Sequence, residues 1–125
     1  MLQFPFAMPK DQLKLDAKDG ALPGQRVLTL TGALTISTLF AFQDFVHADK
    51  SEALIVDMSG VPYIDSAGLG SLISAYVRRE REARRMVLAG VSDRVKTVMT
   101  VSGVDTLFQA YAGVSEAEKT LAAAR

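Results

Sequence analysis

The sequence contains no cysteine. This absence excludes disulfide bonds, thiolate metal sites and cysteine nucleophiles, and it fits a protein of the reducing cytoplasm. The chain also has a single histidine, His47, so few side chains are available to act as a general base near neutral pH. Without cysteine and with one histidine, the chain has few candidates for a catalytic nucleophile or a general base.

The sequence has no surplus of charge, because 14 Lys and Arg residues balance 14 Asp and Glu residues. Nucleic-acid binding relies on clustered basic residues that release counterions from phosphates. The densest basic stretch spans residues 78–85, but Glu80 and Glu82 interrupt it, a pattern typical of a solvated helix face. We therefore expect no direct contact with nucleic acid.

No apolar run approaches the roughly 20 residues that span a bilayer, so we expect no membrane partner. Residues 1–9 are apolar, but Pro5 and Pro9 interrupt them and no basic segment precedes them, which disfavours a signal peptide. These features predict a cytoplasmic protein. At 125 residues the chain has the size of a single domain, with a core at about 13–121 and an additional N-terminal segment at 1–9.

Five strands are expected, at residues 13–18, 27–31, 53–56 and 86–89 and within 106–111. Turn residues separate the first two strands, so these two should form an antiparallel hairpin. Continuous apolar runs form the third and fourth strands, as is typical of parallel strands that helices shield from water. Because later strands alternate with helices, the pattern predicts an α/β fold with a mixed, mostly parallel sheet.

Four helices are expected, at about residues 37–48, 65–85, 92–103 and 115–124. The second is the clearest, because apolar residues recur at i, i+3, i+4, i+7 and i+8 from Leu69 onward. Ser92 suits the N-cap of the third helix, and Gly103 suits its C-terminal stop. Ser115 with Glu118 predicts a capping box for the last helix.

The most informative stretch covers residues 55–70, which lead from a strand through a loop to a helix N-terminus. In one interpretation Asp65 or Ser66 is only the N-cap of that helix. Gly68 and Gly70 favour a functional role as well, because each glycine costs roughly 1 kcal/mol relative to alanine in a helix. Two glycines keep this corner free of bulk, so that another backbone or a visiting active site can approach Ser66.

This stretch resembles the signature of STAS-domain anti-sigma factor antagonists. An apolar strand that ends at Asp57 is followed by a loop and by the motif Asp-Ser-Ala-Gly-Leu-Gly at 65–70. Gly-Ala-Leu at 32–34 is similar to the Gly-x-Leu element of that family, and residues 87–91, the next helix and Phe108 fit its second half. The resemblance covers roughly residues 13–121. It implies a β-α superhelix with about four helices, mainly on one face of the sheet.

The resemblance also implies a function. In that family the serine of the motif is phosphorylated by a partner that is both a serine kinase and an anti-sigma factor. The unphosphorylated antagonist binds this partner and so releases a sigma factor, and a phosphatase restores that form. Ser66 would then be the phosphoacceptor, in a chain that is not an enzyme and needs no metal or cofactor. One departure is Thr35, which stands where the family usually has an acidic residue close to the phosphoacceptor.

The geometry of parallel strands predicts where such a partner would bind. Loops that leave the C-terminal ends of these strands gather at one edge of the sheet, so loops 32–37 and 58–65 should be neighbours. The predicted partner-binding residues are Leu34, Thr35, Ile36, Asp65, Ser66, Gly68 and Leu69. Phe40 and Phe45, on the adjoining helix, widen its apolar surface, either as further core residues or as an exposed aromatic that faces the partner.

Three other functions fit the sequence less well. A serine hydrolase is disfavoured, because His47 is predicted on a different helix and no Gly-x-Ser-x-Gly motif is present. A metal site built from Asp44, Asp57 and Asp65 is disfavoured by their spacing. The main alternative is a STAS subunit that is not phosphorylated, within a transporter-associated or lipid-trafficking complex, where Ser66 has a structural role.

Overall fold

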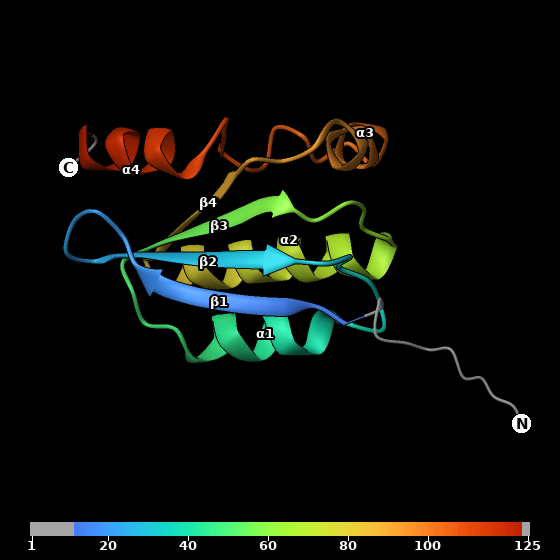
Figure 1. Ribbon diagram of the computed structural model, residues 1–125, viewed down its shortest axis with the longest axis horizontal. Helices are drawn as coiled ribbons and strands as arrows, with labels where there is room; N and C mark the ends of the chain where they lie inside the picture. Colours follow the sequence, from blue (N-terminus) through green and yellow to red (C-terminus); the bar gives the residue numbers. More distant parts are fainter. Residues whose placement is uncertain (1–11, 124–125) are drawn as a thin grey trace, which may run out of the picture.

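The computed structural model describes residues 12–123, which form a five-stranded sheet and four helices (Figure 1). The strands are β1 (Lys14–Asp19), β2 (Gln25–Thr31), β3 (Ala53–Gly60), β4 (Arg85–Ala89) and β5 (Ala110–Tyr111). The helices are α1 (Leu39–Ala48), α2 (Ser66–Arg81), α3 (Asp93–Val101) and α4 (Val114–Ala123). The N-terminal segment 1–9 and the predicted helix end near Ala124 lie outside the described residues.

The strands lie side by side in the order β1-β2-β3-β4-β5. β1 and β2 form an antiparallel hairpin, with Lys14 opposite Thr31 and Asp19 opposite Arg26, whereas the later neighbours are parallel. Parallel neighbours need a crossover connection, which α1 supplies between β2 and β3 and α2 supplies between β3 and β4. The predicted mixed, mostly parallel sheet is confirmed.

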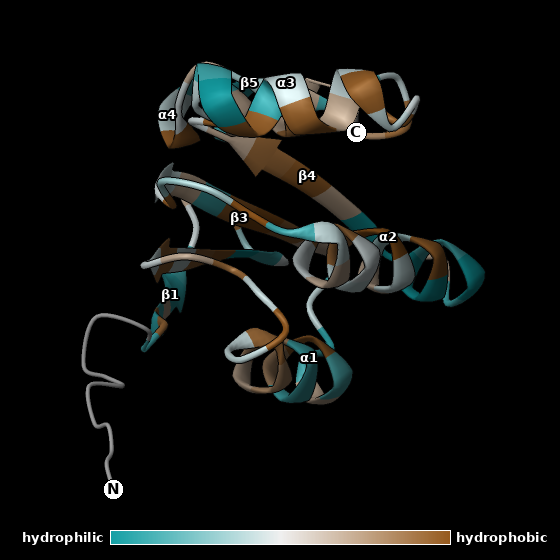
Figure 2. Cartoon of the chain, turned by 90° about the vertical axis from the view of Figure 1, so that its right-hand side faces the viewer, coloured by the Kyte–Doolittle hydropathy of each residue, from teal (hydrophilic) through white to brown (hydrophobic). Residues whose placement is uncertain are grey.

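The helices cover the two faces of the sheet unequally (Figure 2). Phe42, Leu72 and Val95 bring α1, α2 and α3 into the larger buried cluster on one face. α4 packs on the other face, through Ala117 and Leu121. The helices therefore lie mainly on one face, as predicted. No helix within residues 12–123 is both long enough and apolar enough to cross a membrane.

Two boundaries along β3 and α2 differ from the prediction. β3 continues to Gly60 instead of ending at residue 56, because the buried Met58 alternates with the more exposed Asp57 and keeps the period of a strand. α2 ends at Arg81 instead of near residue 85. Ala83 has φ of 58°, a left-handed conformation that turns the chain into β4.

In the C-terminal third, two predictions are confirmed and one is wrong. The short strand predicted within 106–111 is the two-residue β5, and Gly103 ends α3 with φ of 77°. The predicted capping box is wrong, because α4 begins at Val114 and includes Ser115. Glu116 accepts a hydrogen bond from the Ala112 amide at 2.8 Å, and Glu118 instead accepts one from the Ala21 amide at 2.9 Å.

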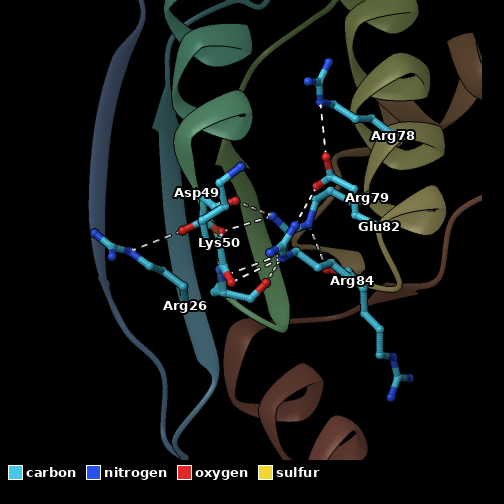
Figure 3. A network of polar contacts seen from close by, with 9 residues as sticks. Arg26, Asp49, Lys50, Arg78, Arg79, Glu82 and Arg84 are labelled. Carbon is cyan, nitrogen blue, oxygen red and sulfur yellow. Dashed lines mark hydrogen bonds and ion pairs between the residues drawn. The ribbon is translucent and has the colours of Figure 1, made fainter.

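A buried arginine fixes the C-terminal end of α2 (Figure 3). Arg79 is 1% exposed, and its Nη1 donates to Asp49 Oδ2 at 3.0 Å. Nη2 donates to the Ser51 carbonyl at 2.7 Å, and Nε donates to the Arg85 carbonyl at 3.1 Å. The guanidinium thus joins α2 to the α1–β3 connection and to the start of β4. Arg79 is therefore an exception to the solvated helix face that was predicted for residues 78–85.

Burial and pairing act on Arg79 in opposite directions. Burial lowers the pKa of Arg79 below its ordinary value, whereas the adjacent Asp49 carboxylate favours the charged form. Because α2 is one continuous helix, anchoring its C-terminal end also orients its N-terminal end, which carries Ser66.

The other end of α2 is positioned by a close backbone contact at Gly68. A Cβ atom at this position would lie 2.0 Å from the carbonyl oxygen of Leu34, in the loop before α1. At Gly70, by contrast, a Cβ atom would meet no heavy atom within 4 Å. Gly68 therefore allows α2 to pack on the backbone of the neighbouring loop. Of the two glycines in the first turns of α2, Gly70 is the one that leaves open space beside the helix.

Replacing Arg79 with alanine should lower the free energy of unfolding by about 3 kcal/mol or more, because a buried ion pair loses one partner. Among the described residues, Asp49, with a side chain 4% exposed, would keep its hydrogen bonds from Ser51, but its one remaining ion pair would be with the more distant Arg26, at 3.9 Å. Arg78→Ala should cost about 1 kcal/mol or less, since Arg78 is exposed and its ion pair with Glu82 is 3.8 Å long. Urea unfolding followed by circular dichroism compares the two; equal losses would contradict this account.

The two glycines of α2 provide a second matched pair. Gly68→Ala should destabilise the fold by about 1–3 kcal/mol, because the new methyl group forces the Leu34 carbonyl to move. Gly70→Ala should stabilise it by roughly 0.5–1 kcal/mol, because alanine is the better helix former and nothing obstructs it. Thermal unfolding of both variants is the measurement. A stable Gly68→Ala variant would show that the close contact does not constrain this corner.

Candidate functional site

The loop after β2 runs beside the loop after β3. The Gly32 amide donates to the Gly60 carbonyl at 2.9 Å, and the Leu34 amide donates to the Tyr63 carbonyl at 3.3 Å. Leu34 and Ile64 form an isolated parallel bridge. The pairing of β2 with β3 thus continues beyond the strands, and the two loops are neighbours, as predicted.

Asp65 is the N-cap of α2, and both of its carboxylate oxygens accept backbone hydrogen bonds. Oδ1 accepts from the Gly68 amide at 2.7 Å, in the first turn of the helix. Oδ2 accepts from the Ile36 amide at 3.0 Å, in the neighbouring loop. One side chain therefore both caps α2 and ties the loop before α1 to the start of α2. The sequence left the cap open between Asp65 and Ser66, and the structure assigns it to Asp65.

Ser66 is the first residue of α2, and it is exposed. Within residues 12–123 its hydroxyl makes no hydrogen bond. Since Asp65 does the capping, this hydroxyl is not needed to hold the helix end. The positive end of the helix dipole and the free amides there would partly stabilise a negative charge at this position.

The seven predicted partner-binding residues lie together, but at different depths. Leu34, Gly68 and Leu69 are buried and support the loops from beneath. Thr35, Ile36, Asp65 and Ser66 reach the surface. We call these four residues the Ser66 surface. Gly70 adjoins it, because residues four apart on a helix share a face and Gly70 follows Ser66 by one turn.

Thr35 organises the loop that carries Ile36. The Thr35 amide donates to Thr38 Oγ1 at 2.9 Å, and Thr35 Oγ1 accepts from the Ser37 amide at 3.2 Å. The Thr35 carbonyl accepts from the Leu39 amide at 2.9 Å, which leads the chain into α1. A neutral hydroxyl with contacts inside its own loop thus stands where the resemblance implies an acidic residue.

Two exposed aromatic residues adjoin these loops along the chain. Phe40 is 62% exposed, so it is not a further core residue of α1, whose buried residues are Leu39, Phe42 and Val46. Tyr63, which lies outside the predicted partner-binding residues, is exposed in the loop before α2, and Arg94 stacks over its ring at 5.3 Å. Its position just before the Asp-Ser motif was the only indication in the sequence that it would lie here.

The other polar candidates lie apart from Ser66. His47 Nε2 is 2.9 Å from Nη2 of Arg78, which follows Ser66 by about 18 Å along α2 at about 1.5 Å per residue. The carboxylate of Asp57 accepts from the amide and the hydroxyl of Ser59. In the part of the chain that the structure describes, no three His, Cys, Asp or Glu side chains are placed to hold a metal ion together.

A family model described as "Mlab, STAS domain" matches residues 19–109, which include the Ser66 surface. The anti-sigma-B factor antagonist of Listeria monocytogenes is 30% identical over 56 residues, which are 45% of this chain and 49% of that protein. The chain thus spans about half the length of the curated relatives it matches.

Solved structures share the fold at low sequence identity. An anti-sigma factor antagonist from Mycobacterium paratuberculosis has a TM-score of 0.77 and 21% identity, over 90% of this chain and 96% of that one. A sulfate transporter family protein from Wolinella succinogenes has a TM-score of 0.68 and 20% identity, over 82% of this chain and 88% of that one. Since the family model matches most of the chain, and these folds superpose on it, the chain belongs to the STAS domain family.

Proposed function

We propose that this chain is a cytoplasmic anti-sigma factor antagonist whose partner binding is switched off by phosphorylation of Ser66. The unphosphorylated form binds an anti-sigma factor that is also a serine kinase, and so releases a sigma factor. The kinase phosphorylates Ser66, and a phosphatase reverses the modification. The observation that carries this proposal is the exposed Ser66 hydroxyl at the start of α2. Asp65, not Ser66, caps this helix. The name of the Listeria relative supports the class of partner.

In this proposal the chain is a substrate and a ligand, not an enzyme. Ser66 Oγ attacks the γ-phosphorus of ATP, and the bond between that phosphorus and ADP breaks, so that ADP leaves. The kinase binds the ATP and supplies the group that takes up the hydroxyl proton. Asp65 is poorly suited to that second role, because both of its oxygens already accept backbone amides. His47 lies at the other end of α2, beside Arg78. The chain therefore contributes an accessible hydroxyl on a rigid helix end.

The added phosphate would disrupt binding through its charge. A phosphoserine carries about −1.5 to −2 charges at pH 7, and the helix N-terminus partly stabilises them, so the fold tolerates the group. A partner surface that fits a neutral hydroxyl would instead have to desolvate a dianion beside Asp65. A loss of about 3 kcal/mol weakens binding by more than about a hundredfold. No large conformational change is required.

The proposed contact region is the Ser66 surface. Its residues come from two loops and one helix end, and the Asp65 hydrogen bonds hold them in a fixed arrangement. A phosphate on Ser66 would stand within this surface, next to Ile36. Leu34, Gly68 and Leu69 act indirectly, by packing beneath it.

A second candidate is a STAS subunit that is not phosphorylated and works within a transporter-associated or lipid-trafficking complex. The fold shared with the Wolinella sulfate transporter family protein supports it. Ser66 would then be a surface residue without a switching role. A gene for a histidine-kinase-like anti-sigma factor beside this one favours the switch, whereas neighbouring transporter genes favour the alternative.

Ser66 should be the sole residue phosphorylated when the chain is incubated with ATP and the histidine-kinase-like anti-sigma factors of the same genome. Mass spectrometry should find one phosphate on the wild type and none on Ser66→Ala. Ser37→Ala removes another exposed serine, in the adjacent loop, and should be labelled like the wild type. Phosphate mainly at other positions, or undiminished labelling of Ser66→Ala, would contradict the proposal.

Ser66→Asp should weaken binding to the same kinase at least tenfold, because it places a negative charge within the Ser66 surface. The melting temperature should stay within a few degrees, since surface substitutions usually change stability by about 0.5 kcal/mol or less. Ser115→Asp adds the same charge to the first turn of α4, on the opposite face of the sheet, and should bind normally. Isothermal titration calorimetry measures both; wild-type affinity of Ser66→Asp would rule out charge as the switch.

A further inference from the structure

Two large apolar side chains are exposed where the loop after β2 leads into α1. Ile36 is 59% exposed and Phe40 is 62% exposed. The Thr35 carbonyl accepts from the amides of Thr38 and Leu39, at 3.0 and 2.9 Å, so a single turn encloses Ile36 just before α1. Phe40 lies in the first turn of α1, four residues after Ile36, with the N-cap Thr38 between them.

The position of Ile36 relative to Ser66 is fixed by two contacts. The Ile36 amide donates to Asp65, the residue next to Ser66, at 3.0 Å. Beneath it, Gly68 packs directly on the backbone of Leu34, in the same loop as Ile36. Ile36 therefore cannot move away from Ser66 unless the cap of α2 or this packing is broken.

We propose that Ile36 and Phe40 form an apolar anchor by which the Ser66 kinase holds this chain, an inference that rests on the proposed function. A kinase that brings ATP to the Ser66 hydroxyl has to cover the surface immediately around it, and Ile36 is held within that surface. Phe40 extends the contact by one turn onto α1.

The chemistry of the anchor predicts the kind of kinase surface that would fit it. A matching kinase has an apolar cleft beside its nucleotide site, which receives the two side chains. Asp44 is exposed and follows Phe40 by four residues, so a basic group at the rim of the cleft would meet a carboxylate there. The large exposed apolar residue on α3, Val101, has no such link to the Ser66 corner; single exposed apolar residues of this kind are ordinary.

The anchor lies outside the group that reacts, so it should contribute equally to the ground state and to the transition state. Removing contacts of this kind raises KM and leaves kcat unchanged. Substitution of Ser66 has a different effect, because it removes the attacking oxygen. The division of an effect between KM and kcat therefore distinguishes an anchor from a residue that positions the hydroxyl.

The test uses the full chain as substrate for the kinase that phosphorylates the wild type. Steady-state phosphorylation is measured for Ile36→Ala, Phe40→Ala and the double variant, with Val101→Ala as the control, because Val101 is 82% exposed on α3. We expect KM for the chain to rise at least fivefold in each single variant and further in the double variant, with kcat within twofold of the wild type. Val101→Ala should match the wild type, and circular dichroism should show that all variants are folded.

The outcomes separate this inference from the proposed function. If Ser66 of the wild type is phosphorylated and both single variants keep its KM, the anchor is wrong and the proposed function stands. If no kinase of the genome phosphorylates the wild type at Ser66, both the anchor and the proposed function are wrong. A lower kcat at unchanged KM would also overturn the anchor. So would a dimer of this chain that Phe40→Ala dissociates in sedimentation, because a second copy would then occupy the surface.

Discussion

The carboxylate of Asp65 is the contact on which the candidate site depends. It accepts one amide from α2 and one from a loop 29 residues earlier in the sequence. The first bond sets where the helix begins, and the second fixes the loop that carries Ile36. Without this side chain, two backbone donors would need water or other partners. A single ionised group thus determines both the place of the Ser66 hydroxyl and the shape of the surface around it.

Two polar contacts hold α2 at its opposite ends. Asp65 caps the N-terminal end, and the buried Arg79 guanidinium binds three carbonyl groups and a carboxylate at the C-terminal end. The apolar residues between them pack into the core of the sheet. A helix held in this way presents its first residue at a constant position. The proposed switch is then a change of charge on a rigid surface, and no movement of secondary structure is needed.

Sequence patterns were sufficient to predict the order of strands and helices along the chain, the hairpin and the meeting of the two loops, whereas the layer of helices on mainly one face was implied by the resemblance to STAS domains. Such patterns were insufficient where a residue's role depends on a distant neighbour. The part played by Gly68 depends on the Leu34 carbonyl, and Glu118 bonds to the hairpin turn instead of capping its own helix. Arg79 was grouped with a solvated run of charges, although its spacing from Leu72 and Ala75 places it on the buried side of α2.

The residues of the Asp-Ser-Ala-Gly-Leu-Gly motif have structural roles that are physically independent. Asp65 caps α2, Gly68 allows the Leu34 backbone to pack closely on the helix, and Leu69 is buried in the core. The Ser66 hydroxyl contributes to none of these. Under the proposed switch, exchange of that one residue removes the oxygen that receives the phosphate and leaves the architecture intact. A lineage with that switch would then lose its regulation in one mutational step and keep a protein that binds its partner permanently. The same scaffold would thereby suit assemblies that need a permanent contact and no switch.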